Sequence, residues 1–436
     1  SSRAVIRAPG SHPGESASPC EHERVSTYGL QGVLNWPQAR SVAQSAAHPL
    51  SAAPARLDEA TGSRLARDLV TVLDDPPVDS AAVDGYAVCG EGPWRVDDLE
   101  VLTPGWACIV RARMPLPRHA DAVLTEASAH VEKHADGSVL VIARDPLNGL
   151  PDESARPDLG EGILRAASIS AAGHALVPAG SPVTPAVVSL AAARGLDGLD
   201  IVRPPVVGTV VLGSSLLDHG LPRQGRVRDA LGAAIPAFVG ALGARGNPAV
   251  RAPDTLDLLT AEIDDADVDV LITTGSTAPG PDNHLREVLR DLNVRWLVDG
   301  VSVTPGSSML LVRLVDGRFL VGLPGDPTAA LAGLVTLVTP LLSSLCDAPR
   351  VDRRRTAVLL EDAPPADYAD DTALVPVLLT SSSAGTMARP LPMSGSDGQV
   401  GWARADAIAV LPPGAGFRGD VAELLDVHGR DLPALP

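Results

Sequence analysis

The sequence predicts a multidomain protein that combines α/β and β architecture. Between residues 205 and 349, β-type runs alternate with helical patterns, which is typical of a doubly wound, mainly parallel sheet. Outside that region, short β-type runs alternate with Pro, Gly and Asp-Gly punctuation, which is typical of small β domains. At 436 residues the chain is also longer than one hydrophobic core usually fills. We therefore expect an α/β domain with a small β subdomain before it and a β domain at the C-terminus.

The composition limits the classes of function. Apolar residues make up 45% of the chain and charged residues 20%, as in ordinary soluble proteins. The formal net charge of −18 opposes binding to a phosphate backbone, and 3% aromatic residues offer few surfaces for base stacking. We therefore expect no nucleic-acid partner. Lys133 is the only lysine, so arginines and backbone amides must bind any anionic substrate.

Cysteine usage and the apolar segments indicate the compartment. The four cysteines are scattered without a CxxC pair, which argues against a zinc site and against a disulfide framework. Residues 1–35 lack the basic and apolar regions of a signal peptide, so they predict a disordered extension. The longest apolar stretch, residues 329–346, contains hydroxyl side chains and follows a tight turn, which favours a buried helix over a membrane span. We expect a cytoplasmic protein without a membrane partner.

Local patterns predict the elements before the α/β domain. Residues 57–73 place apolar side chains near helical spacing until Asp74-Asp75-Pro76-Pro77, which predicts a helix that ends there. Residues 94–142 contain short β-type runs and the turn Asp136-Gly137, which predicts a β subdomain with a hairpin. A short helix is expected over residues 184–195, where Gly195 stops it.

The second half of the chain predicts the α/β domain and the C-terminal β domain. Strands are expected over residues 206–213, 267–275 and 319–323, and each precedes a helical pattern. From residue 351 onward the β-type runs return without a long amphipathic helix. This change of pattern separates the two domains near residue 349.

Two strand–glycine loop–helix units predict an anion site. In both loops glycine permits close backbone approach, and in the second Asp326 can cap a helix whose free amides face a ligand. Because parallel strands end at one edge of a sheet, the two loops should converge. An ordinary helix-start turn is the alternative for the second loop. The predicted binding residues are Thr274, Gly275, Ser276, Gly280, Pro324, Gly325 and Asp326.

Three further groups contain reactive side chains. Asp84 lies in a tight Asp-Gly turn, where it is either a functional carboxylate or an ordinary turn residue. His130 and His134 are four residues apart beside a hairpin turn, where a solvated strand is favoured over a metal site. A third group could meet phosphate or simply face solvent, and it consists of Arg223, Arg226 and Arg228.

Seven short motifs follow one another in order between residues 55 and 430. They are LDEATGSRLA (57–66), SAAVDGYAV (80–88), ADAVLTE (120–126), GEGI (160–163), LITTGSTAPG (271–280), VTPGSS (303–308) and GLPGDP (322–327). In order and spacing they resemble the molybdopterin molybdenumtransferase family, to which the E domain of gephyrin is related.

The resemblance implies a domain layout and an activity. It implies an elongated segment (36–90 and 145–204) with an inserted β subdomain (91–144), an α/β domain for the pterin nucleotide (205–349) and a C-terminal β domain (351–436). It implies a homodimer that uses Mg²⁺, takes molybdate and adenylylated molybdopterin (molybdopterin-AMP) as substrates, and releases AMP. It further implies catalytic roles for Asp84, Glu161 and Asp282, metal binding by Asp84 and Asp282, and cofactor binding by Asp229.

Several charged groups of the family pattern are replaced in this chain. Pro281 and Asn283 stand where the family has acids, and Gly213-Ser214-Ser215 replaces an acidic pair. Carboxylates help at such a site by holding a cation between anions, so these losses leave a second hypothesis open. In it, the chain is a catalytically degenerate paralogue that binds molybdopterin, nucleotide or a partner without turnover. A third hypothesis is the related adenylyltransferase activity, because such enzymes share the α/β domain type.

Overall fold

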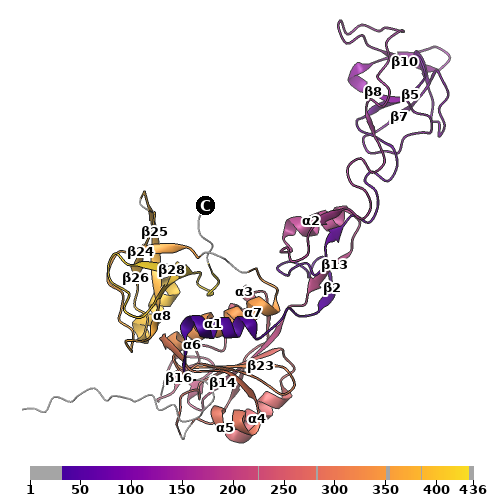
Figure 1. The fold of residues 1–436 in the computed structure, drawn as a ribbon. Coiled ribbons are helices and arrows are strands. Elements are labelled where there is room, and N and C mark those ends of the chain that lie inside the picture. The colour runs from indigo at the N-terminus through magenta and orange to yellow at the C-terminus, as the bar shows by residue number, and fades with distance from the viewer. Residues whose placement is uncertain (1–31, 224, 281–282, 350–353, 384, 432–436) are drawn as a thin grey trace, which may run out of the picture.

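The protein consists of a body and a long arm. The computed structural model describes residues 32–223, 225–280, 283–349, 354–383 and 385–431. The α/β domain and the C-terminal β domain form the body, and the arm leaves the body and ends in a separate β subdomain (Figure 1). The predicted multidomain α/β plus β fold is confirmed. The predicted disordered extension lies almost entirely outside the described residues.

A mixed sheet of six strands organises the α/β domain, in the order β17-β14-β19-β23-β22-β20. Strands β14, β19 and β23 are parallel neighbours. Strand β22 runs antiparallel to β23, and β20 runs antiparallel to β22, so β22 is the one reversed strand in this order. Helices cover both faces, with α3 on one and α4 and α5 on the other. The strands are β14 (Val206–Leu212), β17 (Arg245–Gly246), β18 (Val250–Ala252), β19 (Val270–Thr274), β20 (Arg295–Asp299), β22 (Leu310–Arg313) and β23 (Phe319–Leu323). The helices are α3 (Ala234–Ala241), α4 (Leu256–Asp265) and α5 (Leu285–Asp291).

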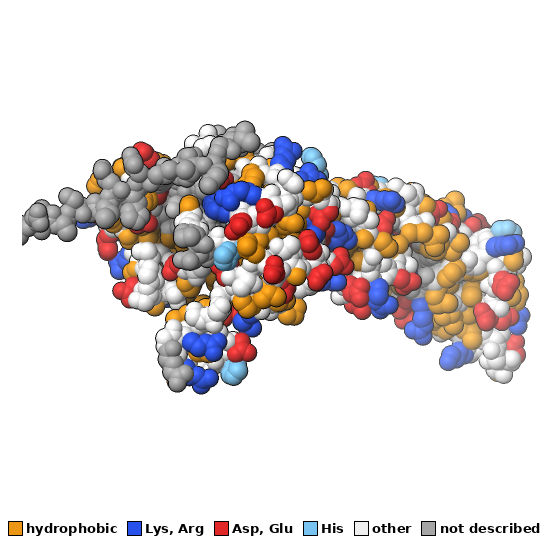
Figure 2. Space-filling model, turned by 90° about the horizontal axis from the view of Figure 1, so that it is seen from below, with side chains coloured by type: hydrophobic (Ala, Val, Ile, Leu, Met, Phe, Trp, Pro, Cys, Tyr) orange, Lys and Arg blue, Asp and Glu red, His pale blue; other side chains and the backbone are white. Residues whose placement is uncertain are grey.

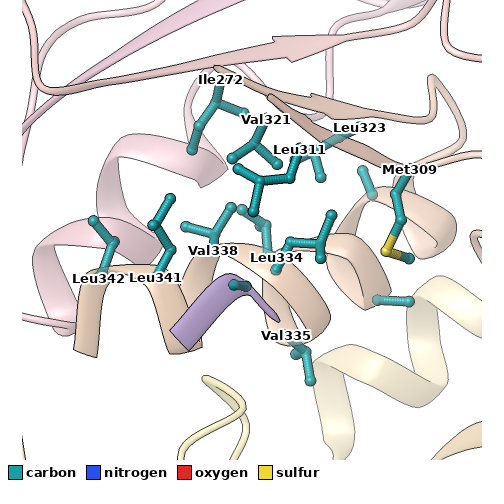
Figure 3. Close-up of a cluster of buried hydrophobic side chains, with 14 of the residues drawn as sticks. Ile272, Met309, Leu311, Val321, Leu323, Leu334, Val335, Val338, Leu341 and Leu342 are labelled. Carbon is teal, nitrogen blue, oxygen red and sulfur yellow. The ribbon is translucent and has the colours of Figure 1, made fainter. Parts of the chain in front are cut away.

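A long helical stretch lies at the centre of the body. It consists of α6 (Pro327–Gly333), a π-helical turn η2 (Leu334–Val338) and α7 (Thr339–Leu345). Figure 3 shows its side chains, such as Leu334 and Val338, pointing toward the sheet residues Leu311 and Val321. By length and composition it could cross a membrane, but 83% of its most apolar window is buried inside the protein. The predicted buried helix is therefore confirmed.

The first helix, α1 (Trp36–Ser45), packs on this central helix rather than on the arm. Asn35 caps it, with its side chain accepting from the Gln38 amide. The preceding strand β1 (Leu34–Asn35) pairs in parallel with β21 (Val301–Thr304). The expectation that residues 36–90 lie wholly in the elongated segment was wrong for α1, because its apolar face completes the core of the body.

A buried arginine of α1 binds the π-helical turn. Arg40 is 8% exposed, and its guanidinium donates to the carbonyl oxygens of Val335 (2.5 Å) and Gly429 (3.1 Å). It also lies over the Trp36 ring, 5.1 Å from the centroid, and near Asp431. Burial lowers the pKa of Arg40 to about 10, so the group stays charged at neutral pH. One side chain thus links α1, the central helix and the C-terminal segment.

The arm contains short strand pairs and one helix, α2 (Pro185–Ala193). The helix expected over residues 57–73 is absent, which corrects that prediction. Gly62 has φ +89°, and Leu65 and Leu69 are buried against α2 and neighbouring strands, so tertiary contacts override the local spacing. The strand pairs are β2 (Ala52–Arg56) with β13 (Gly198–Val202), β3 (Leu69–Val70) with β12 (Ala175–Val177), and β4 (Ser80–Ala81) with β11 (Ile163–Leu164).

The β subdomain at the end of the arm is one sheet in the order β8-β5-β7-β6-β10-β9. The predicted hairpin turn is confirmed, since Asp136 accepts from the Ser138 amide between β9 and β10. Trp94 is fully buried in its core. Its strands are β5 (Gly85–Cys89), β6 (Trp94–Val96), β7 (Trp106–Val110), β8 (Ala122–Thr125), β9 (Ala129–Lys133) and β10 (Val139–Ala143).

The C-terminal domain has a sheet in the order β1-β21-β25-β26-β24-β28-β27, so two of its strands come from outside residues 351–436. It also contains α8 (Gly395–Arg404), which packs against α6 and β25. The expectation of a domain without a long helix was wrong, because the Gly- and Ser-rich sequence of α8 conceals its periodicity. The remaining strands are β24 (Thr356–Leu359), β25 (Thr372–Ser382), β26 (Gly385–Pro390), β27 (Ala407–Leu411) and β28 (Val421–Leu425).

Replacing the buried arginine should destabilise the body strongly. Arg40→Met keeps the apolar stem but leaves the carbonyls of Val335 and Gly429 without their donor, so we expect a loss of roughly 3–5 kcal/mol in unfolding free energy. Urea unfolding followed by tryptophan fluorescence measures this loss. The control is Arg67→Met, whose side chain is 75% exposed in an ion pair with Asp200 and should change stability by less than about 1 kcal/mol. Equal losses in both variants would contradict the role of Arg40.

Candidate anion-binding site

Three loops meet at the carboxyl edge of the parallel strands. The register aligns Val211 of β14 with Thr274 of β19, and Thr274 with Leu323 of β23, so the loops that follow begin side by side. A Cβ added at Gly325 would lie 3.5 Å from the Cα of Gly275. Gly275 itself has φ +87°, and a Cβ there would lie 3.3 Å from the Leu212 carbonyl oxygen. Glycine therefore allows the three backbones to approach, and the predicted convergence is present.

Side chains hold the loop after β19 in one conformation. Ser276 has φ +59°, and its hydroxyl donates to Asp254 (3.2 Å) and accepts from the Leu285 amide. Arg286 donates through Nε to the Thr277 carbonyl oxygen at 2.9 Å. The same guanidinium forms an ion pair with Asp299, which holds it in position beside Thr277. These contacts order the start of the loop in the absence of a ligand.

The turn between β21 and β22 forms a further wall of the site. The hydroxyls of Thr277 and Ser308 are 3.0 Å apart, which joins this turn to the loop after β19. Gly306 has φ +103°, and a Cβ there would lie 2.7 Å from the Ala329 carbonyl oxygen of α6. The motif VTPGSS pointed to this turn, whereas no sequence signal pointed to Arg286. Hydroxyls and amides, rather than lysines, line this wall.

The turn before α6 differs in detail from the prediction. Asp326 caps the helix, because its Oδ1 accepts from the amides of Thr328 (3.0 Å) and Ala329 (2.9 Å). The amides beyond the turn are thus used by the cap and do not face a ligand, which corrects the prediction. Within the described residues, the amides of Gly325 and Asp326 have no hydrogen-bond acceptor. These two amides are the anion donors that the turn offers, since Pro324 has no N–H.

Asp229 stabilises a loop and is not available to a ligand. It is 8% exposed, and its Oδ1 accepts from the amides of Leu231 (2.9 Å) and Gly232 (2.8 Å). Its Oδ2 accepts from Arg251 at 2.8 Å. Burial alone would raise the pKa of Asp229, but these donors outweigh it and lower the pKa below its ordinary value. The predicted cofactor-binding role is therefore replaced by a structural one.

Asp84 and Glu161 lie on neighbouring segments at the other end of the arm. Both side chains are exposed, and each accepts one hydrogen bond from a backbone amide. Asp84 Oδ1 accepts from the Ala112 amide (2.7 Å), and Glu161 Oε2 accepts from the Asp158 amide (3.0 Å). Asp84 directly precedes β5, which pairs with β8, and the Val123 amide of β8 donates to the Glu161 carbonyl. Figure 1 places β5 and β8 far from β14 and β23. Within one chain, the predicted catalytic acids and the glycine loops do not meet.

The remaining candidates form no metal centre among the described residues. Asp282 lies outside that part of the chain. Gly280 is exposed and accepts from the Asn283 amide at 3.3 Å. His130 lies on β9, and its Nε2 is 3.4 Å from Oε1 of Glu132. In the described ranges no group of three or more His, Cys, Asp or Glu side chains could hold a metal ion.

The fold and the loops define an α/β ligand-binding protein of the doubly wound class, with its site at the carboxyl edge of the sheet. Residues 34–195 match the model for the MoeA N-terminal region (domain I and II), and residues 208–344 match that for a probable molybdopterin binding domain. The chain belongs to the MoeA family.

Individual relatives agree with this family. A molybdopterin molybdenumtransferase of Staphylococcus aureus (strain MSSA476) is 26% identical over 373 residues, which cover 83% of this chain and 88% of the relative. A relative of the same name from Staphylococcus epidermidis (strain ATCC 12228) is 26% identical over 396 residues, covering 85% and 90%. The fold is similar to a molybdopterin biosynthesis MoeA protein from Pyrococcus horikoshii, with a TM-score of 0.69, 24% identity, and coverage of 91% and 99%.

The close approach at Gly275 can be tested against a matched glycine. Gly275→Ala should cost about 1–2 kcal/mol for the positive φ and more for the contact with the Leu212 carbonyl. Gly137→Ala is the control, because Gly137 has φ +83° but nothing within 4 Å of the added Cβ. Urea unfolding and hydrogen exchange of the β14 and β19 amides measure the loss of stability in both variants. If Gly275→Ala lost no more unfolding free energy than Gly137→Ala, the close approach of Gly275 to the Leu212 carbonyl would be contradicted.

The stability that Asp229 provides should depend on pH. Its pKa is lower in the folded than in the unfolded chain, so its stabilisation is present above the ordinary value of 3.8 and is lost as pH falls through the folded value. Asp229→Asn should therefore destabilise the protein by about 1–3 kcal/mol at pH 7 and by progressively less below about pH 4. Urea unfolding of both proteins between pH 3 and pH 7 measures this difference. A difference that is constant with pH would contradict it.

Proposed function

We propose that this protein inserts molybdate into adenylylated molybdopterin and releases AMP, as a molybdenumtransferase of molybdenum cofactor biosynthesis. The supporting observation is the convergence of the loops at Gly275, Ser308 and Gly325 within the segment that matches the molybdopterin-binding model. Molybdate and phosphate are both oxyanions, and the loops offer amides and hydroxyls at close spacing. The degenerate, non-catalytic alternative is not favoured, because the relatives match over most of their length and are molybdenumtransferases by name.

Asp84 and Glu161 are the proposed ligands of a divalent cation at the end of the arm, and Mg²⁺ is the proposed ion. Asp84 and Glu161 each use one carboxylate oxygen on a backbone amide, so one oxygen of each is left for a ligand. Mg²⁺ usually takes one or two carboxylates and completes its shell with water and substrate phosphates. When bound, the ion would neutralise developing negative charge on those phosphates. The residues of the chain would hold and orient the cation, while the glycine loops hold the pterin end.

The proposed site requires two copies of the chain. Because β5 and the glycine loops lie at opposite ends of one molecule (Figure 1), the arm of one protomer must approach the body of another for both sets to touch one substrate. A homodimer of this kind is supported by hydrophobic side chains on the arm, some of which Figure 2 shows exposed. The exposed apolar residues along this part of the chain include Val70, Val72, Leu73, Val78 and Ile169.

A cytoplasmic location completes the proposal. The described cysteines are Cys89, Cys108 and Cys346, and all three are free. Burial raises the pKa of Cys346 to about 11, so its thiol remains protonated. Unpaired buried thiols fit a reducing compartment, as does an activity that uses small soluble substrates.

The role of Asp84 can be tested by the release of AMP. Asp84→Asn removes a cation ligand but keeps the shape of the loop, so molybdate-dependent AMP release should fall at least about tenfold at limiting Mg²⁺. Binding of molybdopterin to the glycine loops should be unchanged. Calorimetric titration and an assay of released AMP measure the two separately. Wild-type AMP release in this variant would exclude Asp84 from the reaction.

Mixing two inactive variants tests whether each site needs both protomers. Asp84→Asn damages the arm, and Gly275→Val damages the body. In a mixed dimer one of the two sites is intact, so a re-equilibrated equal mixture should recover about a quarter of wild-type activity, as expected for random pairing. No recovery, despite subunit exchange verified by differently tagged copies, would contradict a shared site.

A further inference from the structure

A loop rich in arginine leaves the same edge of the sheet as the glycine loops. It follows β14 and contains the short parallel strands β15 (Leu216–Leu217) and β16 (Val227–Arg228). Figure 1 shows β16 beside β14. Its arginines are all exposed, and they are Arg223, Arg226 and Arg228. These arginines gather positive charge on a chain whose net charge is −18.

Hydrogen bonds hold two of these arginines next to the end of β14. Arg226 donates through Nη2 to the Leu216 carbonyl oxygen at 2.8 Å, and Arg228 through Nη1 to the Leu217 carbonyl oxygen at 3.4 Å. The Val227 amide donates to the Ser215 carbonyl, which closes the base of the loop. Since Gly213 ends β14 and the Leu212 carbonyl lies against Gly275, the two guanidinium groups are placed on the same edge as the anion site.

These positive charges are not neutralised within the described residues. Among the described residues none of the three arginines has a carboxylate within 4 Å, whereas Arg251 is paired with Asp229, which directly follows Arg228. The acid of the loop, Asp218, is paired instead with His219 at 2.6 Å. A guanidinium has five N–H donors, and Arg226 and Arg228 each use one on a backbone carbonyl. The others remain free for an anion.

We propose that this arginine loop binds the phosphate groups on the nucleotide side of the substrate, while the glycine loops hold the other end. This inference rests on the proposed function, because it takes the substrate to be a pterin linked to a nucleotide. Guanidinium groups bind phosphate in a bidentate manner, and their fixed positions reduce the entropy lost on binding. A local positive field on an acidic protein also attracts anions to this edge of the sheet.

The test is a titration of AMP, and separately of inorganic pyrophosphate, into the full chain. The variant Arg226→Gln/Arg228→Gln removes both charges but keeps an amide donor for the carbonyls of Leu216 and Leu217, so the loop can keep its shape. We expect the affinity of both ligands to fall at least about tenfold and to depend less steeply on salt concentration. Unchanged thermal unfolding verifies that the variant is folded. The charge-keeping variant Arg226→Lys/Arg228→Lys should retain most of the salt dependence.

A matched pair of arginines provides the control. Arg295 and Arg313 are register partners on β20 and β22 of the same domain, both are exposed, and Arg313 also donates to a backbone carbonyl. They lie near the amino end of β23, away from the glycine loops, so Arg295→Gln/Arg313→Gln should bind both ligands like the wild type. An equal loss in this control, or no loss in the loop variant, would overturn the proposal.

The readouts separate this inference from the proposed function. If the wild type releases AMP in the presence of molybdate but the loop variant binds AMP and pyrophosphate normally, the arginine loop is not the phosphate site and the proposed function stands. If the binding of AMP and pyrophosphate depends on Arg226 and Arg228 but the wild type shows no molybdate-dependent AMP release, the loop assignment stands and the proposed reaction is wrong.

Discussion

The buried helical stretch from Pro327 to Leu345 is the part of the structure on which the rest of the body depends. The sheet packs on one of its sides, and α1 and the C-terminal domain pack on the others. Each fully buried leucine in this stretch contributes roughly 1.5–3 kcal/mol through the hydrophobic effect. Because the helix begins at Pro327, two residues after Gly325, its packing also fixes the loop that approaches Gly275. The position of the anion site is therefore set by the core, and not only by the loops themselves.

The π-helical turn inside that helix explains why a charged side chain is buried in the same core. A π-turn disturbs the regular hydrogen bonds and leaves carbonyl oxygens in need of donors. Arg40 meets the Val335 carbonyl, and the Thr339 hydroxyl donates to the carbonyls of Leu334 and His428. A Cβ added at Gly429 would lie 2.8 Å from the Cα of Val335, so the C-terminal segment packs directly against the π-helical turn. Such polar contacts specify one orientation of the C-terminal domain, at the expense of burying a charge.

The sequence predicts best what local patterns determine. The strand–glycine loop–helix units, the hairpin at Asp136 and the buried helix all follow from periodicity and turn chemistry, and they were found where expected. Tertiary contacts decided the failures. The apolar residues Leu65 and Leu69 fit helical spacing but pack against α2 and neighbouring strands. Helix α1 packs on residues about 300 positions further along the chain. At the site, turn chemistry predicted Asp326 and the family resemblance implied Asp229. The sequence could not show that protein donors occupy Oδ1 of Asp326 and both carboxylate oxygens of Asp229.

The presence of a single lysine, Lys133, limits how this chain can bind anions. Neutral donors such as the Gly325 amide and the hydroxyls of Thr277 and Ser308 give direction to an oxyanion but supply no net charge. On a protein with a net charge of −18, local arginines can supply a favourable field, and the proposed cation would add to it. The unpaired arginines lie beside β14, whereas the acids that suit a cation lie at the end of the arm. In the proposed reaction, the body and the arm would therefore each supply part of the charge that balances one substrate, and this agrees with the proposed pairing of two copies.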